Sequence, residues 1–325
     1  MENFKLTLFL CFFVLTSWGP GSVSPAAEEL ESIYAYAGGW GAFGEGDGQF
    51  KQLRRAEVGP DGTVYVADTF NYRVQYFTPE GSFLGKWGSF GEGEGEFGGV
   101  YGLAVAPDGD VYVPDSGNDR IQRFSANGIF KGAWGSAGIS AGQFYDPISL
   151  DVAPDGDIYV VEFGNNRVQR FTADGSFLGI WGAEGTGPGQ FQNPIDVAVA
   201  PDGTVYVADM ENLRIQYFTP DGGYLGEWGR EWKPGAPPAG GEFKWLYGVH
   251  VAPNGNVFAS DAGLGRVHIF SPQGSYLGFF SLPKEEYESF FSPHDVSVAP
   301  DGTVYVADSG NHRVQYFRPV AAEDK

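Results

Sequence analysis

One phrase recurs through the sequence and limits what the chain can fold into. It is written VAPDG or a close variant, and its valines stand 47 residues apart except for one interval of 52. These valines are Val58, Val105, Val152, Val199, Val251 and Val298. A period of about 40 to 50 residues is typical of repeat architectures, in which one copy cannot bury its apolar faces without its neighbours. The chain is therefore one repeat array, although 325 residues would otherwise suggest two domains.

Each copy divides into four short strands. The first ends at the recurring valine, a Pro-Asp-Gly turn follows, and the second reads TVYVAD at residues 63–68. The third reads RVQYF at 73–77, and another turn leads to a fourth, SFLGKWG, at 82–88. Proline starts such turns and glycine supplies the positive φ that they need. Four antiparallel strands per copy are typical of a propeller blade.

The two ends of the array are incomplete in complementary ways. The sixth copy ends at RVQYFRPV, residues 313–320, and lacks a fourth strand, whereas an unmatched fourth strand, SIYAYAGGWG, stands at residues 32–41. We predict an all-β fold: a six-bladed β-propeller of four-stranded antiparallel blades, closed by an N-terminal strand that completes the last blade. Such closure removes the open sheet edges that promote aggregation.

Residues 1–26 have the layout of a secretory signal. Lys5 precedes an apolar run, and small residues and prolines follow it. An uncleaved anchor is the alternative, although the run is short for a membrane span. The sequence predicts export, to a secreted, cell-surface or periplasmic location, of a propeller over residues 27–320 with a short acidic tail at 321–325. The single cysteine, Cys11, lies in the leader, which excludes disulfides and thiol chemistry from the exported chain.

The net charge of −21 at pH 7 limits the partners. Nucleic-acid binding needs cationic side chains that neutralise phosphates, and anionic membrane surfaces repel the same excess of carboxylates. We therefore expect no nucleic-acid partner and no membrane contact beyond the leader. We also expect the protein to be a monomer.

Charged positions repeat from copy to copy. The acid that ends the second strand is Asp68, Asp115, Glu162, Asp209, Asp261 or Asp308, and the arginine that begins the third is Arg73, Arg120, Arg167, Arg214, Arg266 or Arg313. On adjacent strands around a tight turn, such a pair suits a charge-assisted hydrogen bond. An asparagine between them in five copies (Asn71, Asn118, Asn165, Asn212 and Asn311) suits a left-handed turn position. We interpret these repeated side chains as scaffold, and we expect function where the copies differ.

The repeated phrases resemble the NHL-repeat family of six-bladed propellers. The resemblance rests on GEGDGQF at 44–50, GSFLGKWG at 81–88 and VAPDGTVYVADSGNHRVQYF at 298–317, and it extends over about residues 32–320. The chain is similar to exported prokaryotic NHL-repeat proteins and, more distantly, to propellers like the peptidyl-α-hydroxyglycine lyases. Because the family includes protein-binding and RNA-binding modules as well as lyases and lactonase-like enzymes, the resemblance implies the fold and leaves the function open.

Candidate binding residues lie where the innermost strands begin, at one mouth of the propeller channel. The first position of those strands is Arg54, Tyr101, Ile148, Ile195, Tyr247 or His294, and the next is Arg55, Gly102, Ser149, Asp196, Gly248 or Asp295. A strand-connecting turn adds Phe163, and the one long inter-blade segment, residues 230–248, adds Trp245. We predict that a ligand binds at Arg54, Tyr101, Phe163, Trp245, Tyr247 and His294.

The resemblance also raises the question of a metal site. In the lyase branch, histidines of Pro-His pairs converge on a channel zinc, and His294 fits that motif, although no other copy repeats it. A catalytic zinc usually has three protein ligands. The candidate metal-ligating residues are His294, Asp295, Asp196 and His250. Ca²⁺ on channel carboxylates and carbonyls is the alternative to Zn²⁺, and no cofactor is required by the sequence.

Two functions from different classes follow from these residues. The first is an exported, non-catalytic binding propeller that presents its loops to a protein, a peptide or a glycan at the channel mouth. The alternative is a metal-dependent lyase or lactonase-like enzyme that uses the His/Asp site. The sequence has no convergent set of acid, base and metal-ligating residues, which favours the first, whereas a stoichiometric metal would favour the second.

Overall fold

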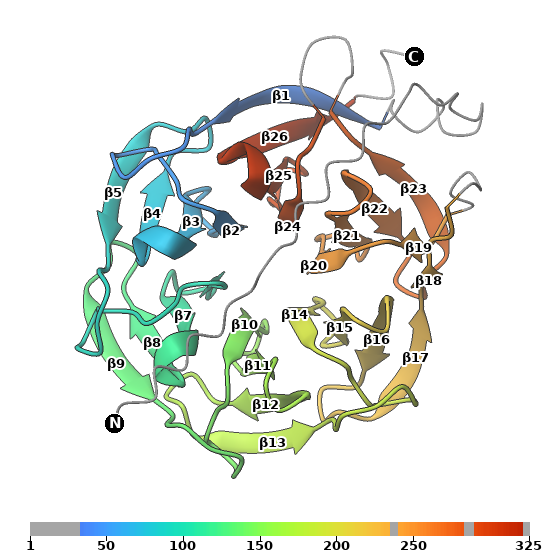
Figure 1. Ribbon diagram of the computed structural model, residues 1–325, viewed down its shortest axis with the longest axis horizontal. Coiled ribbons are helices and arrows are strands. Elements are labelled where there is room, and N and C mark those ends of the chain that lie inside the picture. The colour runs from blue at the N-terminus through green and yellow to red at the C-terminus, as the bar shows by residue number, and fades with distance from the viewer. Residues whose placement is uncertain (1–32, 235–239, 283–288, 321–325) are drawn as a thin grey trace.

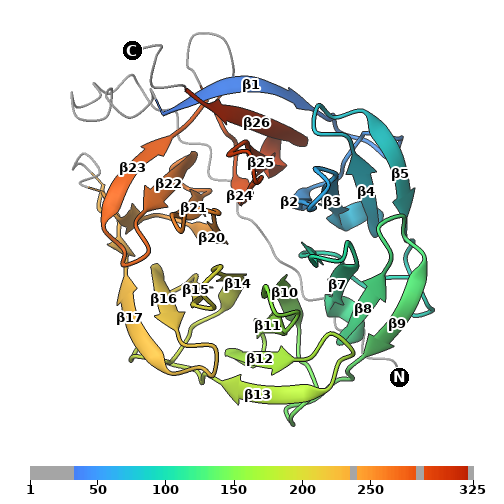
Figure 2. The ribbon, with the colours of Figure 1, turned by 180° about the vertical axis from the view of Figure 1, so that it is seen from behind.

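The computed structural model describes residues 33–234, 240–282 and 289–320, and its strands form a ring of six four-stranded antiparallel sheets (Figure 1). One strand of each sheet lies near the central axis and the outermost strand lies at the rim, as the opposite view also shows (Figure 2). Within these ranges, no helix combines the length and apolar character that crossing a membrane requires. The predicted leader at 1–26 and the acidic tail at 321–325 lie outside the described residues.

The blades follow the order of the chain. Blade 1 contains β2 (Leu53–Val58), β3 (Val64–Asp68), β4 (Arg73–Phe77) and β5 (Phe83–Trp87), and blade 2 contains β6 (Ala104–Val105), β7 (Val111–Asp115), β8 (Arg120–Phe124) and β9 (Phe130–Trp134). Blade 3 contains β10 (Pro147–Val152), β11 (Ile158–Glu162), β12 (Arg167–Phe171) and β13 (Phe177–Trp181), and blade 4 contains β14 (Pro194–Val199), β15 (Val205–Asp209), β16 (Arg214–Phe218) and β17 (Tyr224–Trp228). Blade 5 contains β20 (Leu246–Val251), β21 (Val257–Asp261), β22 (Arg266–Phe270) and β23 (Tyr276–Phe280).

Blade 6 is assembled from both ends of the array. It contains β24 (Pro293–Val298), β25 (Val304–Asp308), β26 (Arg313–Pro319) and, at its rim, β1 (Tyr34–Trp40). Three short 3-10 helices follow second strands: η1 (Thr69–Asn71), η2 (Ser116–Asn118) and η3 (Ser309–Asn311). The long segment between blades 4 and 5 adds a parallel pair, β18 (Arg230–Glu231) with β19 (Glu242–Phe243).

These boundaries confirm the predicted fold class, the number of blades and the strand plan. Every innermost strand ends at the recurring valine. The glycine of each following turn has a φ between 85° and 92°, which an L-residue adopts only with strain. The turn chemistry in the sequence therefore fixes where each first strand ends.

The ring closes as predicted. β1 pairs antiparallel with β26, and Trp40 lies opposite Val314 (Figure 1). The same Trp40 ring lies against Gly81 in the turn between β4 and β5 of blade 1, where a Cβ atom would come within 2.4 Å of the indole. The N-terminal strand therefore completes blade 6 and also attaches it to blade 1.

The hydrophobic core lies between adjacent blades rather than inside any one of them. Between blades 6 and 1, for example, Phe50, Val66 and Phe77 pack with Tyr305 and Val314 in one buried cluster. Burial of each such side chain contributes about 1.5–3 kcal/mol. Because each blade supplies only one side of two clusters, removal of a blade exposes apolar surface on both of its neighbours.

The repeated acid and arginine form a network with the loop that enters each blade. In blade 1, Asp68 Oδ2 accepts hydrogen bonds from Arg73 Nε at 2.7 Å and from Asn71 Nδ2 at 2.9 Å, while Oδ1 accepts one from the Lys51 backbone N–H at 2.8 Å. Arg73 in turn donates to loop carbonyls, among them that of Gln49 at 2.9 Å. We call this group of acid, asparagine, arginine and the glutamine two residues later the acid clamp.

The predicted pairing of acid with arginine is confirmed in five blades, with the pairs Asp68–Arg73, Asp115–Arg120, Glu162–Arg167, Asp209–Arg214 and Asp308–Arg313. The prediction that the asparagine is the left-handed residue is wrong. The left-handed residue is the next one, for example Tyr72 with φ 52° and His312 with φ 55°. The asparagine instead donates its side-chain amide to the acid, as Asn71 does to Asp68, and this requires it to stay within the turn.

Blade 5 departs from this pattern. Leu264 stands where other blades have asparagine and His268 where they have glutamine. Among the described residues, Arg266 makes no ion pair with Asp261, and its guanidinium lies 4.3 Å from the centroid of the Phe279 ring. Asp261 instead accepts backbone N–H groups, including those of Lys244 at 2.8 Å and Trp245 at 3.1 Å. The blade that follows the long inter-blade segment has therefore lost most of its clamp.

Removal of β1 tests the closure. We expect a chain that begins at residue 42 to unfold at lower urea concentration than a chain that begins at residue 33, and to self-associate. The physical reason is that the shorter chain exposes the edge of β26 together with the apolar face that Trp40 covers. Urea denaturation and light scattering after size-exclusion chromatography measure both effects. Equal stability and a monodisperse monomer for both chains would contradict the closure.

Candidate functional site

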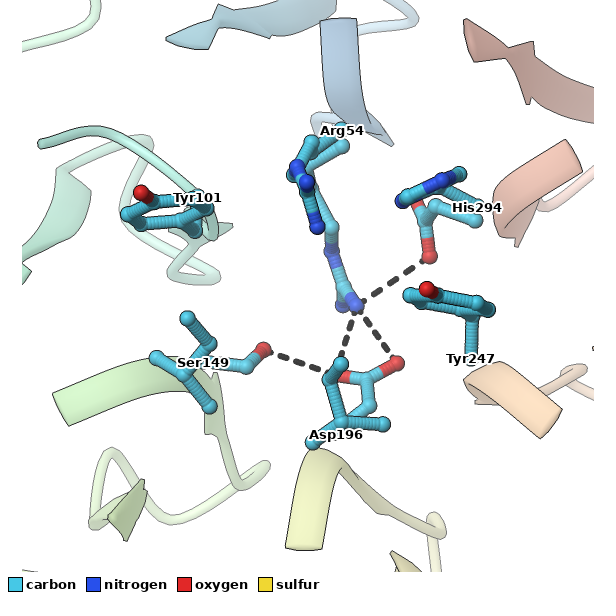
Figure 3. A pocket seen from close by; sticks show the side chains of 10 residues that line it. Arg54, Tyr101, Ser149, Asp196, Tyr247 and His294 are labelled. Carbon is cyan, nitrogen blue, oxygen red and sulfur yellow. Dashed lines mark hydrogen bonds and ion pairs between the residues drawn. The ribbon is translucent and has the colours of Figure 1, made fainter. Parts of the chain in front are cut away.

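A small pocket lies on the central axis, at the end where the inter-blade loops enter the innermost strands (Figure 3). Its volume is about 30 Å³, which is room for one or two water molecules or for the end of a ligand. Ten residues line it: Arg54, Arg55, Tyr101, Ile148, Ser149, Ile195, Asp196, Tyr247, His294 and Asp295. They are the six residues of the first predicted column and the four non-glycine residues of the second, so the sequence located the pocket.

Bulges in the innermost strands turn two consecutive residues toward this pocket. In blade 1 the pairing passes from Leu53↔Asp68 to Arg55↔Ala67, which leaves Arg54 as the extra residue. The pairing shifts at the same place in blades 3, 4, 5 and 6. A bulge redirects a side chain that a regular strand would point elsewhere. No pattern in the sequence marked these bulges.

The outermost residues of the pocket form the mouth layer, defined as Arg54, Tyr101, Ile148, Ile195, Tyr247 and His294. The guanidinium of Arg54 lies over the Tyr101 ring, 5.2 Å from its centroid. Across the pocket, the rings of Tyr247 and His294 are 4.1 Å apart at an angle of 34°. Burial lowers the pKa of His294 well below its usual value, and the positive charge of Arg54 lowers it further. The mouth layer is therefore aromatic and apolar, with one cation and a neutral histidine.

Beneath the mouth layer, Arg55 is 3% exposed and is surrounded by carboxylates. Its Nη1 donates to both oxygens of Asp196 at 2.8 and 2.9 Å and to Asp295 at 3.2 Å (Figure 3), and its Nη2 donates to Glu57 at 3.1 Å. Burial alone would lower the pKa of this guanidinium, but the attraction of the surrounding carboxylates outweighs that effect and raises it. Arg55 is therefore a fixed cation whose two terminal nitrogens are paired, while its buried Nε has no hydrogen-bond partner among the described residues.

The same carboxylates also hold neighbouring blades together. Adjacent innermost strands are not hydrogen-bonded to each other, so their N–H groups need side-chain partners. Asp295 of blade 6 accepts the N–H of Ala56 in blade 1 at 3.0 Å, and Asp196 of blade 4 accepts that of Val249 in blade 5 at 2.8 Å. These acids therefore have a structural role that is independent of any ligand.

A third layer lies one step further along the innermost strands, and its polar members are Glu57, Asp151, His250 and Ser297. Burial and the neighbouring Glu57 raise the pKa of Asp151 to about 7. Burial and, to a smaller extent, the charge of Arg55 lower the pKa of His250 to about 4. Asp151 also accepts the N–H of Val199 at 2.7 Å, so this layer links blades 3 and 4. Asp295 and Asp196 link blades 6 and 1 and blades 4 and 5 in the same way.

The four predicted metal-ligating residues are divided among these layers. Asp196 and Asp295 share Arg55, His294 stacks on Tyr247, and His250 lies in the third layer. Among the described residues, no three His, Cys, Asp or Glu side chains converge as metal ligands would. A metal at Asp196 and Asp295 would therefore have to displace a buried guanidinium.

Two predicted ligand-binding residues lie outside the pocket. Phe163 follows β11 and packs against the core between blades 3 and 4. Trp245, which is 54% exposed, precedes β20, and the Lys244 ammonium lies 5.3 Å from its ring centroid and 5.8 Å from that of Trp232. The structure therefore brings Arg54, Tyr101, Tyr247 and His294 together in one pocket. Phe163 and Trp245 lie elsewhere, so a binding role for them stays a prediction.

Comparison with protein families matched the NHL repeat at residues 144–171, 191–218 and 290–317. Each match runs from the loop phenylalanine that precedes a blade to the phenylalanine of its third strand, in blades 3, 4 and 6. A comparison with curated protein sequences found no match. The NHL repeats and the six blades agree with the resemblance read from the sequence.

Solved structures share the fold at low sequence identity. A structure described as streptogramin B lyase is 14% identical, with a TM-score of 0.59 over 88% of this chain and 98% of the other. A catalytically inactive virginiamycin B lyase from Staphylococcus aureus with quinupristin is 17% identical, with a TM-score of 0.55 over 89% and 88%. Hydrazine synthase of Kuenenia stuttgartiensis is 13% identical, with a TM-score of 0.58 over 85% and 97%. The structural similarity establishes the propeller fold. Identities this low say nothing of the chemistry.

The acids around Arg55 predict a pH dependence of stability. Burial raises the pKa of Asp295 to about 8, whereas the unfolded carboxyl has a pKa near 3.9. The folded state therefore keeps a proton that the unfolded state has released, and this stabilisation is lost as the pH rises through about 8. For Asp295→Asn, whose amide oxygen still accepts the Ala56 N–H, we expect the fall in unfolding free energy between pH 6 and 9 to shrink by about 2 kcal/mol.

Urea denaturation at several pH values measures this change, and the exposed substitution Glu80→Gln serves as the control. The control should follow the native pH profile. An Asp295→Asn profile as steep as the native one would contradict the assignment of the proton to this carboxyl.

Proposed function

Taking the chain as a six-bladed propeller built from NHL repeats, we propose that it is a non-catalytic binding protein that holds a segment of a protein or peptide at its channel mouth. One observation carries the proposal. The mouth layer contains the residues that differ from copy to copy, and all six blades contribute one of them to a single pocket. The residues that repeat in most copies serve the acid clamp instead.

The mouth layer has the composition of a recognition surface. Tyrosine and arginine dominate the energetics of many protein interfaces because they offer large, rigid contact areas with polar ends. Arg54 and Tyr101 enter blades 1 and 2, where acid clamps hold the entering loops. Tyr247 enters blade 5, where Asp261 accepts backbone N–H groups of the entering loop and Asp196 accepts the N–H of Val249. A rigid site loses little conformational entropy on binding, which favours affinity from a small contact area.

We also propose that the protein acts after export, because the sequence before residue 27 has the layout of a secretory signal. Mass spectrometry of the protein recovered from the producing cells tests this proposal. It predicts a mature N-terminus close to Ala27 and a location outside the cytoplasm. An intact N-terminus in cytoplasmic material would contradict export.

A metal-dependent lyase or lactonase-like enzyme is the second candidate. The observation that favours it is the group of buried acids with raised pKa values below the pocket, since such groups gather at catalytic sites. The blade-to-blade hydrogen bonds that Asp295 and Asp151 accept explain their burial without any reaction. Metal content that is stoichiometric with the protein, together with metal-dependent turnover of a lactone or a hydroxyglycine peptide, would favour this candidate over the first.

Substitution in the mouth layer tests the binding role. Peptides selected from a random library on the immobilised native protein should lose about tenfold or more in affinity to Tyr247→Ala and to Tyr101→Ala, because each substitution removes an aromatic contact at the centre of the site. Tyr224→Ala, at an exposed position on the outermost strand β17, is the matched control and should bind as the native protein does. Isothermal calorimetry measures the three affinities.

Two outcomes would contradict the peptide-binding role. In one, the selected peptides bind Tyr247→Ala and Tyr101→Ala as tightly as they bind the native protein. In the other, selection on peptides fails while an array of glycans gives ligands that these substitutions abolish, which would assign the same mouth to a sugar.

A further inference from the structure

Two consecutive arginines of β2 have opposite electrostatic environments. Arg55 has three acidic side chains within hydrogen-bonding distance. Among the described residues, Arg54 has no carboxylate within ion-pair distance, and its guanidinium lies over the Tyr101 ring, 5.2 Å from its centroid. The Nε atoms of both arginines are buried without a hydrogen-bond partner, so the difference lies in the terminal nitrogens. An unpaired guanidinium that is partly withdrawn from water has lost hydration without a compensating partner, which costs free energy.

The other members of the mouth layer leave the charge of Arg54 uncompensated. They are two tyrosines, two isoleucines and His294, which is neutral because burial holds its pKa well below the usual value. The mouth layer therefore carries one positive charge on a protein whose net charge is −21. This isolated cation, in a pocket that opens to solvent, has the environment of a binding site for an anion.

From these observations we propose that Arg54 binds a carboxylate group at the end of the ligand, most simply the C-terminal carboxylate of a peptide. This inference rests on the proposed role of the mouth in binding peptides and specifies the group that is recognised. A planar guanidinium pairs with a planar carboxylate through two parallel hydrogen bonds. The apolar side chain of the last residue would then contact Ile148, Ile195 and the rings of Tyr101 and Tyr247.

Charge favours a carboxylate over a phosphate, and size favours the end of a molecule over a whole one. A volume of about 30 Å³ admits a terminal group rather than a whole molecule. Asp196 lies directly beneath, and its charge repels a doubly charged anion more strongly than a singly charged one. A single carboxylate can therefore pair with Arg54 at a smaller electrostatic cost than a phosphate dianion.

The test compares peptides that differ only at the C-terminus. Short peptides with an apolar last residue are prepared as free acids and as C-terminal amides, and their binding to the native protein is measured by calorimetry. The free acid should bind about tenfold or more tightly than the amide, because charge-assisted hydrogen bonds are lost in the amide. Arg54→Gln should remove this difference by weakening the free acid alone.

A matched control variant is available in blade 6. Arg318 also lies over a tyrosine ring, at 5.9 Å from Tyr316, but it is exposed on β26 outside the pocket. Arg318→Gln should keep the full preference for the free acid. Because Arg54 makes no ion pair among the described residues, and its contact with Tyr101 is at the edge of the fold, Arg54→Gln should unfold at nearly the same urea concentration as the native protein, which would exclude loss of binding through misfolding.

Further probes separate the sources of the carboxylate and the two proposals. An amidated peptide with an internal glutamate that binds as tightly as the free acid, and loses affinity in Arg54→Gln, would assign the carboxylate to a side chain. Inorganic phosphate that competes more strongly than acetate would overturn the preference for a carboxylate.

Equal binding of acids and amides, unchanged in Arg54→Gln, would overturn the subsite and leave peptide binding intact. If no peptide binds but acetate still shifts the NMR signals of the native protein and not of Arg54→Gln, the subsite stands and the peptide-binding role fails.

Discussion

The acid clamp is the interaction on which the rest of this structure depends. A buried carboxylate such as Asp68 accepts an N–H from the entering loop, while Arg73 and Gln75 fasten the carbonyls of the same loop. Each loop carries the chain from the rim of one blade to the innermost strand of the next. The loop also has backbone hydrogen bonds of its own, such as Phe50 N–H to the Ala42 carbonyl, but the clamp is what attaches it to the second and third strands of the blade that it enters. Residues that do not line the pocket therefore help to set the geometry of its mouth.

Two consecutive residues of β2, Arg54 and Arg55, have different roles: Arg55 is part of the scaffold, and Arg54 is part of the candidate site. Arg55 links three acidic side chains and belongs to the network that joins the blades. Arg54, raised by the bulge, faces the pocket without such partners. The paired arginine neutralises part of the acidic layer under the pocket, so an anion at Arg54 does not meet that layer unscreened. The bulge thus places the charge of Arg55 within the scaffold and leaves the charge of Arg54 available to a ligand.

Blade 5 shows what happens when the clamp is weakened. The segment that enters it is longer, and two clamp positions have changed, to Leu264 and His268. His268 is fully buried, and neither of its ring nitrogens has a hydrogen-bond partner among the described residues. Its Nε2 lies 3.7 Å from Asp261 Oδ2, and its ring contacts Phe243 and Tyr276, where a glutamine in the other blades makes hydrogen bonds. Blade 5 is therefore held by packing and by the backbone N–H groups that Asp261 accepts, whereas the other five blades pair the acid with the arginine.

The sequence by itself determined the repeat, the strands and their turns, the number of blades, the closing strand and the two columns of residues that line the pocket. These features depend on local chemistry and on the number of strands in each copy. Pro-Asp-Gly turns end strands at fixed points, and the fourth strand that the last copy lacks is supplied by β1, which begins at Tyr34. Only the tertiary structure decided which members of those columns meet. Arg55 pairs with Asp196 and Asp295, which lie 141 and 240 residues away, and a bulge leaves Arg54 unpaired beside it. The sequence could not choose between the two arginines, because their partners come from across the ring and depend on where closure places every blade.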